Sequence, residues 1–318
     1  MTLTELKYIV AVARERHFGR AAEACFVSQP TLSVAIRKLE DELGVIIFER
    51  GGSEIGVTPV GERVIAQAHK VLQESAAIKE IARMGHDPLA GPLRVGVIYT
   101  IGPYLLPRLI PTQIERTPQM PLILQENFTA KLVELLRQGE IDCSIMALPL
   151  PDSGLSMVAL YDEPFMVAMP ANHAWTRRAE IDAEDLKQEN MLLLGSGHCF
   201  RDHVLSVCPE LSRYSDASEG IQRTFEGSSL ETIRHMVAAG IGLTVMPVTS
   251  LMGNEHPESR LLKYVPFKAP APERRVVLAW RKSFPRMTAI KALAQAIQAT
   301  RLPGVRMLEL DAGSLDEQ

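Results

Sequence analysis

The sequence of 318 residues has only four cysteines, too few for the disulfide scaffolds of small secreted proteins. It contains no run of about 18 uncharged apolar residues, which excludes a membrane-spanning helix. Its N-terminus lacks the pattern of a signal peptide, because Glu5 precedes the first apolar stretch and no small-residue cleavage site follows. We therefore expect a cytoplasmic protein with reduced thiols. Any cysteine pair that oxidises there is a sensor or a catalyst rather than a structural link.

An excess of charge of one sign is missing as well. The chain has 34 Lys and Arg against 38 Asp and Glu, and residues 1–86 hold 11 of each kind. A strongly basic surface is the usual mark of a protein that binds nucleic acid. If the N-terminal part binds DNA, it must use a few locally placed basic side chains, and we expect it to bind as a dimer.

Three helices are predicted at the N-terminus, over residues 3–16, 20–25 and 29–43. The third has Ser28 as its N-cap and Gly44 as its C-cap. A short helix, a tight turn and a capped helix are typical of a helix-turn-helix. The expected apolar face of the third helix comprises Leu32, Ile36, Leu39 and Leu43.

The opposite face of this third helix carries the functional interpretation. Successive helical residues turn by about 100°, which places small, polar and basic side chains outward, where they can enter a DNA major groove. A solvated face of a small helical bundle has the same pattern, so the helices alone leave both interpretations open. The candidate DNA-contacting residues are Gln29, Pro30, Thr31, Ser33 and Arg37, with Val34 beside them.

A wing and a long helix follow. Short strand signals over 45–48 and 55–57 flank Arg50, which we expect to meet a phosphate. Thr58 and Pro59 then start a long helix. Apolar residues form a heptad-like seam along it, and a solitary helix with such a seam needs a partner, most simply a second copy of the chain. The seam comprises Val64, Ala68, Val71, Ser75, Ile78 and Ala82.

Beyond a hinge at 85–92, strand and helix signals alternate, which implies βαβ units and a parallel sheet. Strands are expected at 93–98, 122–126, 141–147, 165–169, 191–194, 243–246 and 276–280, and helices at 104–115, 130–138 and 229–239. The chain thus divides into a DNA-binding domain (1–58), a linker and dimerisation helix (59–86), an effector domain (87–306) and a C-terminal tail (307–318).

The stretch FGRAAEACFVSQPTLSVAIRKLEDELGVIIFERGGSEIGVTPVGE, residues 18–62, resembles the winged helix-turn-helix of the LysR-type transcriptional regulators. The resemblance continues through FEGSSLETIRHMVAAGIGLTVMP. It implies an α/β fold with an N-terminal winged helix-turn-helix, a long linker helix and a two-subdomain effector domain similar to periplasmic binding proteins. It also implies a DNA-binding transcription regulator, activator or repressor, that binds promoter DNA, works with RNA polymerase and assembles as a homotetramer.

The motif GSGHCFRD at 195–202, followed by Cys208, resembles the branch of that family that senses hydrogen peroxide. The resemblance implies that peroxide oxidises Cys199 and that Cys208 resolves the product as a disulfide, which glutaredoxin or thioredoxin would reduce. It implies no cofactor, no metal and no enzymatic turnover. The implied peroxide-pocket residues are Thr100, Thr129, His198 and Arg201.

The chemistry of this segment can also be argued from its residues. A thiolate is the reactive form of cysteine, and the flanking His198 and Arg201 favour the anion, as would the dipole of a helix that begins near Phe200. If 199–208 is helical, nine steps of ~1.5 Å hold the two Cα atoms roughly 13 Å apart, whereas a disulfide needs about 7 Å or less. We hypothesise that oxidation rebuilds this segment and repositions the DNA-reading domains.

Other interpretations remain open. A lone cysteine is usually a small buried hydrophobe, as we expect for Cys25 and Cys143, and Thr100 and Thr129 have the positions of ordinary helix caps. A regulator that binds a small organic ligand would not need Cys199, and a thiol peroxidase would turn over repeatedly with a reductant. A periplasmic solute-binding protein is excluded by the missing signal peptide. A zinc site would use His198, Cys199, His203 and Cys208, without the paired spacing of strong zinc motifs.

Overall fold

The computed structural model describes residues 1–49, 55–84, 87–150, 154–209, 229–251 and 260–310. Contacts between residues divide the chain into two compact units, Met1–Asp87 and Pro88–Gln318. In the described part of the chain, no helix is long and apolar enough to cross a membrane.

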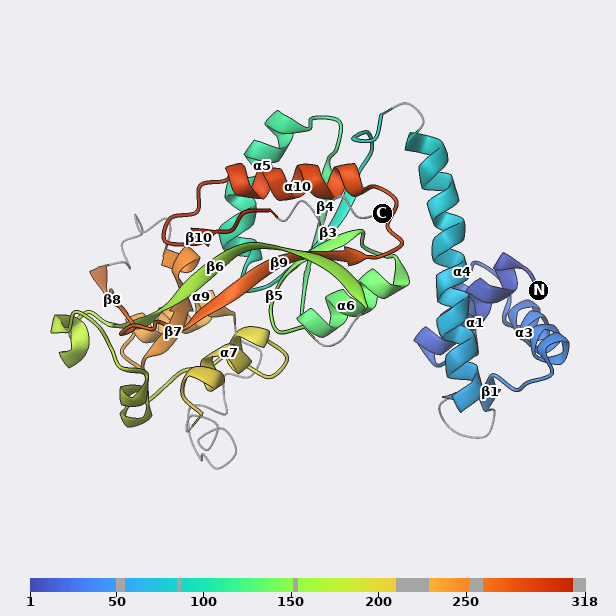
Figure 1. Ribbon diagram of the computed structural model, residues 1–318. Helices are drawn as coiled ribbons and strands as arrows, with labels where there is room; N and C mark the ends of the chain where they lie inside the picture. The colour runs from blue at the N-terminus through green and yellow to red at the C-terminus, as the bar shows by residue number, and fades with distance from the viewer. Residues whose placement is uncertain (50–54, 85–86, 151–153, 210–228, 252–259, 311–318) are drawn as a thin grey trace. The chain divides into compact units, whose positions relative to one another are not determined.

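The first unit begins with three helices (Figure 1): α1 (Leu3–Glu15), α2 (Phe18–Ala24) and α3 (Gln29–Leu43). The α3 caps are as predicted, because the Ser28 hydroxyl accepts from the Thr31 N–H and Gly44 is left-handed with φ of 65°. However, α2 begins two residues earlier than expected. The His17 imidazole caps it by accepting from two backbone N–H groups of its first turn.

The apolar face of α3 forms much of the core of this unit. Leu32, Ile36 and Leu39 are fully buried, as predicted. The prediction for Leu43 is wrong, since this residue lies at the end of the helix and is 38% exposed. The core therefore closes one turn before the C-cap of α3.

A two-stranded hairpin follows, in which β1 (Phe48–Glu49) pairs antiparallel with β2 (Gly56–Val57). The first strand starts three residues later than predicted, and Phe48 pairs with Val57. Arg50, the predicted phosphate contact, lies outside the described residues.

The long helix α4 (Pro59–Met84) begins as predicted, with the Thr58 hydroxyl accepting from the Gly61 N–H. A Cβ atom at Gly61 would lie 2.4 Å from the Ile47 carbonyl oxygen. Glycine therefore allows the start of α4 to approach the backbone that leads into β1.

The first half of the α4 seam packs on its own unit. Ala68 is buried in the core, together with Ile65, and Val64 and Val71 pack against that core. The expectation that this part of the seam needs a second copy of the chain is therefore wrong. Ile78, further along the helix, is 68% exposed and leaves an apolar residue there for a partner.

The second unit contains a sheet of order β10-β6-β9-β5-β3-β4. Its strands are β3 (Leu93–Ile98), β4 (Leu122–Asn127), β5 (Cys143–Ala147), β6 (Leu155–Pro170), β9 (Glu273–Arg281) and β10 (Arg306–Met307). Only β4, β3 and β5 run parallel, and the remaining pairs are antiparallel. The predicted parallel sheet is thus correct for the βαβ part and wrong for the rest, where a returning chain supplies antiparallel strands.

Helices cover both faces of this sheet. α5 (Gly102–Arg116) and α10 (Met287–Ala299) lie on one face and α6 (Thr129–Gln138) on the other (Figure 1). We call the apolar cluster they enclose the first core; it includes Val95, Ile145 and Leu293. The helix α10 and the strand β10 have no counterpart in the sequence-based prediction.

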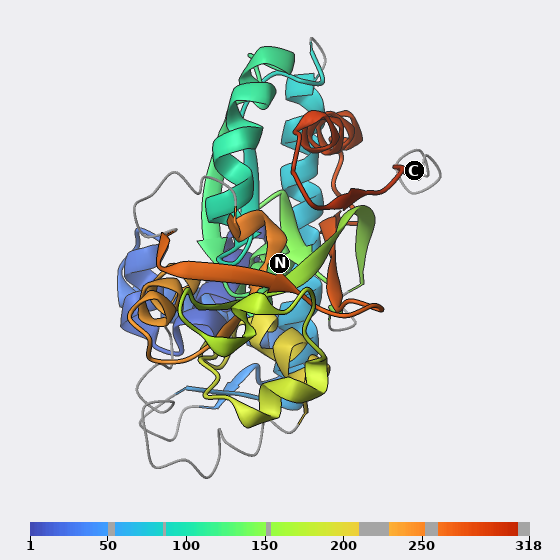
Figure 2. The same ribbon diagram turned by 90° about the vertical axis from the view of Figure 1, so that its left-hand side faces the viewer.

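A smaller subdomain is built on the second half of β6, which pairs there with β7 (Thr244–Pro247) and β8 (Leu262–Pro266). The predicted strand at 165–169 is therefore part of a 16-residue strand, which passes between the subdomains (Figures 1 and 2). The predicted strand at 191–194 reduces to one isolated bridge from Met191 to Leu243. The remaining elements are η1 (Ala174–Arg177), η2 (Ala183–Gln188), α7 (Cys199–Val207), α9 (Leu230–Ala238) and η4 (Val248–Leu251).

We call the apolar cluster of this subdomain the second core; it includes Val167, Phe200 and Val245. Two separate cores joined by continuous strands make an effector unit of two subdomains. The expected fold class is confirmed: an α/β protein with a winged helix-turn-helix, a long helix and a two-subdomain effector unit.

Candidate redox site and nucleic-acid interface

The two candidate redox cysteines lie at opposite ends of α7. Cys199 is its first residue and Cys208 is its C-cap, so the helix starts one residue before the expected position. Neither thiol is in a disulfide. Because the first N–H groups of a helix have no partner within it, the start of α7 presents a partial positive charge next to Cys199.

These two cysteines also face different cores. Cys199 is half-buried and packs against the first core, which belongs to the other subdomain. Cys208 is 2% exposed and lies within the second core. Nine helical steps of ~1.5 Å separate their Cα atoms by roughly 13 Å, and a disulfide needs about 7 Å or less. The reduced arrangement cannot form the bond without a change in α7.

Three rings from distant segments meet beside Cys199, and we call them the ring cluster: Tyr99, Phe128 and His198. The ring centroids of Phe128 and His198 are 4.8 Å apart, and those of Tyr99 and Phe128 are 5.3 Å apart. Each of these residues directly precedes a predicted site residue, namely Thr100, Thr129 or Cys199. The ring cluster therefore brings the backbones of all three predicted positions together.

Arg274 of β9 makes a second connection around Cys199. Its Nη1 donates to Thr100 Oγ1 over 2.8 Å and its Nη2 donates to the Thr100 carbonyl oxygen over 2.9 Å. Its guanidinium also lies 5.1 Å from the centroid of the Phe200 ring. Cys199 thus lies between His198, whose ring contacts the residues that precede the two threonines, and Phe200, whose ring contacts the guanidinium that binds Thr100.

Neither threonine acts as a helix cap. The N-cap of α5 is Ile101 and that of α6 is Phe128, and neither helix start has a capping hydrogen bond from that side chain. Thr129 Oγ1 is buried without a hydrogen-bond partner among the described residues. A buried hydroxyl without a partner is costly, so Thr129 has donor and acceptor capacity available for a small polar ligand.

The expected electrostatic support from the flanking residues needs a correction. His198 is 7% exposed, and this burial lowers its pKa, which favours the neutral ring over a positive charge beside Cys199. The Arg201 Nη1 donates to the Leu194 carbonyl oxygen over 2.8 Å. The cation that contacts this site through Phe200 and Thr100 is instead Arg274.

Sequence reasoning missed Arg274, Tyr99 and Phe128. The alternation of ERRVVLAWR in β9 is a signal for Arg274, because it places that arginine on the inward side. No comparable signal identifies the two aromatic residues, since their roles depend on which segments the fold brings together.

His203 ties the middle of α7 to the other subdomain. Its Nε2 lies 2.7 Å from the Leu148 carbonyl oxygen and its Nδ1 is buried without a partner. Burial lowers the pKa of this ring. Among the described residues, no group of three or more His, Cys, Asp or Glu side chains is arranged to hold a metal.

The other two cysteines lie outside α7, Cys25 in the first unit and Cys143 in β5. Cys143 is completely buried in the first core, as expected, and burial raises the pKa of its thiol well above the ordinary value. Cys25 is half-buried against the core of the first unit, so the expectation of full burial is only partly met.

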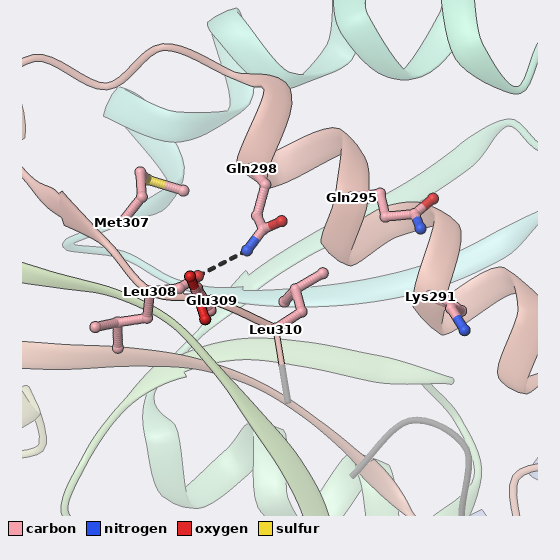
Figure 3. Close-up of a pocket in the computed structure, with 7 residues that line it drawn as sticks. All are labelled: Lys291, Gln295, Gln298, Met307, Leu308, Glu309 and Leu310. Carbon is pink, nitrogen blue, oxygen red and sulfur yellow. Dashed lines mark hydrogen bonds between the residues drawn. The ribbon is translucent and has the colours of Figure 1, made fainter. Parts of the chain in front are cut away.

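A surface pocket lies apart from these residues, between α10 and the end of the described chain (Figure 3). Gln298 spans it by donating from Nε2 to the Leu308 carbonyl oxygen over 2.7 Å. None of the predicted peroxide-pocket residues lines it. Its lining comprises Lys291, Gln295, Gln298, Met307, Leu308, Glu309 and Leu310.

The outward face of α3 is open to solvent as predicted. Its side chains are exposed apart from Ser33, which is half-buried. Val34, with an exposed fraction of 66%, adds an apolar residue to the same face. The exposed residues that were predicted to contact DNA are Gln29, Pro30, Thr31 and Arg37.

Models of two domain families, both from LysR proteins, match the chain. Residues 3–62 match the bacterial regulatory helix-turn-helix proteins of the lysR family, and residues 86–301 match the LysR substrate binding domain. The chain belongs to the LysR family. It is therefore a LysR-type, DNA-binding transcription regulator, and the outward face of α3 belongs to its helix-turn-helix.

Relatives of this LysR-type regulator are similar over nearly its whole length. The DNA-binding transcriptional dual regulator OxyR of Escherichia coli is 39% identical over 299 residues, covering 94% of this chain and 95% of that protein. A full-length OxyR from Pseudomonas aeruginosa with a cysteine-to-aspartate substitution is 51% identical, with a TM-score of 0.76 and coverage of 97% and 99%. A hydrogen-peroxide-bound cysteine mutant of OxyR from Corynebacterium glutamicum is 32% identical, with a TM-score of 0.61 and coverage of 94% and 92%.

Proposed function

We propose that this LysR-type regulator senses hydrogen peroxide through Cys199 and transmits the signal by forming a disulfide with Cys208. The observation that carries the proposal is that the ring cluster and Arg274 connect the chain segments that contain Thr100, Thr129 and Cys199. The resemblance to OxyR proteins, one of which has bound peroxide, supports it.

The proposed reaction has two steps. In the first, the Cys199 sulfur attacks one peroxide oxygen, so that an S–O bond forms as the O–O bond breaks and the second oxygen leaves as water with the thiol proton. The product is a sulfenic acid. In the second, the Cys208 sulfur displaces the hydroxyl from Cys199, giving the disulfide and a second molecule of water.

Disulfide formation would then act as the switch. The two sulfurs start at opposite ends of α7 and face different cores, so the bond requires that α7 unwinds or moves. Movement of a helix between two subdomains is a common way to reorient attached domains. A thioredoxin or glutaredoxin would reset the switch by reducing the bond.

The DNA-binding part of the proposal places α3 in the major groove. Gln29, Thr31 and Ser33 would contact base edges, Pro30 would pack against the groove, and Arg37 and Arg50 would contact phosphates. The regions 1–58, 59–86, 87–306 and 307–318 would serve as DNA-binding domain, dimerisation helix, redox-sensing domain and tail. The tetrameric assembly, the contact with RNA polymerase and the cytoplasmic location belong to the same proposal.

DNA footprinting tests the sensing step. The reduced protein would first select a binding fragment from a genomic library, and the footprint on it would then be compared before and after micromolar peroxide. We expect the footprint to change for the wild type and to stay fixed for Cys199→Ser. A footprint that peroxide leaves unchanged in the wild type would reject peroxide sensing, and one that changes only with a small organic molecule would favour a ligand-binding regulator.

A further inference from the structure

A buried ion pair lies behind the candidate peroxide pocket. Arg274 and Glu163 face each other across the antiparallel strands β9 and β6, and both side chains are completely buried. The Arg274 Nε donates to Glu163 Oε2 over 2.8 Å. A buried pair of this kind contributes little net stability over apolar residues of similar size, so its presence calls for another reason.

The second carboxylate oxygen of Glu163 is also fully engaged. Oε1 accepts from the Thr249 N–H over 3.0 Å and from the Thr249 hydroxyl. Glu163 is therefore fixed by the backbone and side chain of η4 on one side, and it fixes the guanidinium of Arg274 on the other. These hydrogen bonds hold the Arg274 guanidinium against Thr100.

The orientation of Arg274 decides what the Thr100 hydroxyl can do. Arginine only donates hydrogen bonds, so Thr100 Oγ1 must act as the acceptor in its bond with Nη1. Its own hydrogen stays available, and no described residue accepts it. The bond from Nη1 keeps this hydrogen turned away from Arg274, so that the hydroxyl can donate it to another molecule.

We infer that Glu163 is a positioning residue for the peroxide reaction. Resting on the proposed function, the inference assigns Glu163 to hold Arg274, so that the Thr100 hydroxyl donates to the oxygen that leaves as the O–O bond breaks. The leaving oxygen gains negative charge as it accepts the electron pair of that bond, and a donor aimed at developing charge accelerates such a step. Sulfur loses the two electrons that the peroxide gains.

The test compares two reactions of the reduced, full-length protein. Loss of the Cys199 thiol is followed by peptide-resolved mass spectrometry, with hydrogen peroxide in one series and with iodoacetamide in the other. Alkylation needs the same sulfur but breaks no O–O bond. In variants whose circular dichroism spectrum matches that of the wild type, the ratio of the two rate constants therefore reports placement of the peroxide.

Glu163→Gln should lower the peroxide rate constant at least about tenfold and change alkylation by less than about threefold, since one donor aimed at the charge is worth about 10²–10³ in rate. The matched control is Asp162→Asn, next to Glu163 on β6. It weakens ion pairs with Arg275 of β9 and Arg306 of β10 and removes no group that contacts Thr100. It should leave the ratio unchanged. Equal losses in both reactions, or no loss in either, would overturn the assignment.

Thr249→Val provides a variant that disturbs the fold less, because it removes only the hydroxyl donor to Glu163 and keeps the backbone N–H donor. It should lower the ratio by about threefold, as expected for a partly loosened donor, and an unchanged ratio contradicts the inference even if Glu163→Gln does not fold. If the wild type reacts with peroxide no faster than free cysteine, the proposed function itself fails. A fast wild type with an equally fast Glu163→Gln overturns only the role of Glu163.

Discussion

The DNA-reading face of α3 and the redox site around Cys199 differ in what they leave to solvent. On α3, Gln29, Thr31 and Arg37 are exposed and their polar groups can reach a large partner from outside. Around Cys199, Thr100 and His198 are buried, with exposed fractions of 3% and 7%. A large partner cannot reach groups that are buried in this way.

The two regions also differ in how many chain segments supply their functional side chains. A single capped helix is enough to present the α3 side chains, so local sequence fixes that surface. The redox site takes one residue or more from each of four distant segments, and its polar groups are held by the packing of two cores. Substitutions should therefore act through direct contacts at α3, whereas at the redox site they should act through orientation and burial.

The largest effect is expected from Thr129→Val. Its hydroxyl is buried without a partner, so replacing it with a methyl group removes a donor for peroxide and at the same time an unsatisfied polar atom. The peroxide rate constant of Cys199 should fall by about 10²–10³, the usual cost of losing one aimed donor. The free energy of unfolding should stay the same or rise. Stopped-flow kinetics and urea denaturation measure the two quantities.

Thr244→Val is the matched control for this prediction. Thr244 is also buried, but its hydroxyl donates to the Leu192 carbonyl oxygen over 2.7 Å. This variant should lose about 1 kcal/mol of stability and keep the wild-type peroxide rate constant. If Thr129→Val instead lost stability and kept the wild-type peroxide rate constant, the Thr129 hydroxyl would stabilise the fold and would not take part in the peroxide reaction.

At α3 the expected effects are smaller and are measured on DNA. Gln29→Ala should reduce the preference for one base pair by about 10- to 100-fold, since a bidentate base contact is worth about 1–3 kcal/mol. Arg37→Ala should weaken binding to all sequences alike and lower the slope of log affinity against log salt by about 0.9. Fluorescence anisotropy on the selected fragment and its single-base variants gives both values.

Lys131→Ala controls for the loss of a surface charge, because Lys131 lies on α6 in the other unit and its side chain is 43% exposed. Its affinity and salt slope should match those of the wild type. If Gln29→Ala weakened all sequences equally, the residue would contact the backbone of DNA rather than a base.

The contrast also explains how much of each region could be predicted from the sequence. The cap at Ser28, the stop at Gly44 and the start of α7 depend on residues a few positions apart, and all three were predicted within one residue. The Arg274–Thr100 contact spans 174 positions in the chain, and no local pattern encodes such a distance. The same limit applies to the ring cluster.

Elements that serve two structures at once were also predicted poorly. The first half of β6 pairs with β9, and its second half pairs with β8 of the smaller subdomain. The two halves therefore pack against different cores. Only 165–169 had a clear strand signal. The α4 seam likewise packs on its own unit in one half, and periodicity could not show which partner covers it.

The smallest predicted effect concerns pH and the buried histidines of α7. Burial lowers the pKa of His203 and of His198 below the value of about 6.5 that an unfolded chain would have. Above that pH both rings are neutral in either state, and stability does not depend on them. Below it the unfolded chain takes up protons more readily than the folded one, so the free energy of unfolding should decrease as the pH falls.

His203→Gln separates this effect from the tether to Leu148. Glutamine can still donate to the Leu148 carbonyl oxygen but does not titrate, so stability at pH 7 should change by less than about 1 kcal/mol, and the decrease toward pH 5 should be shallower than in the wild type. Urea denaturation of the reduced protein at a series of pH values gives the slope. If the free energy of unfolding had the same slope against pH in both proteins, protonation of His203 would not contribute to the loss of stability. The predicted pH dependence would then have to come from His198 alone.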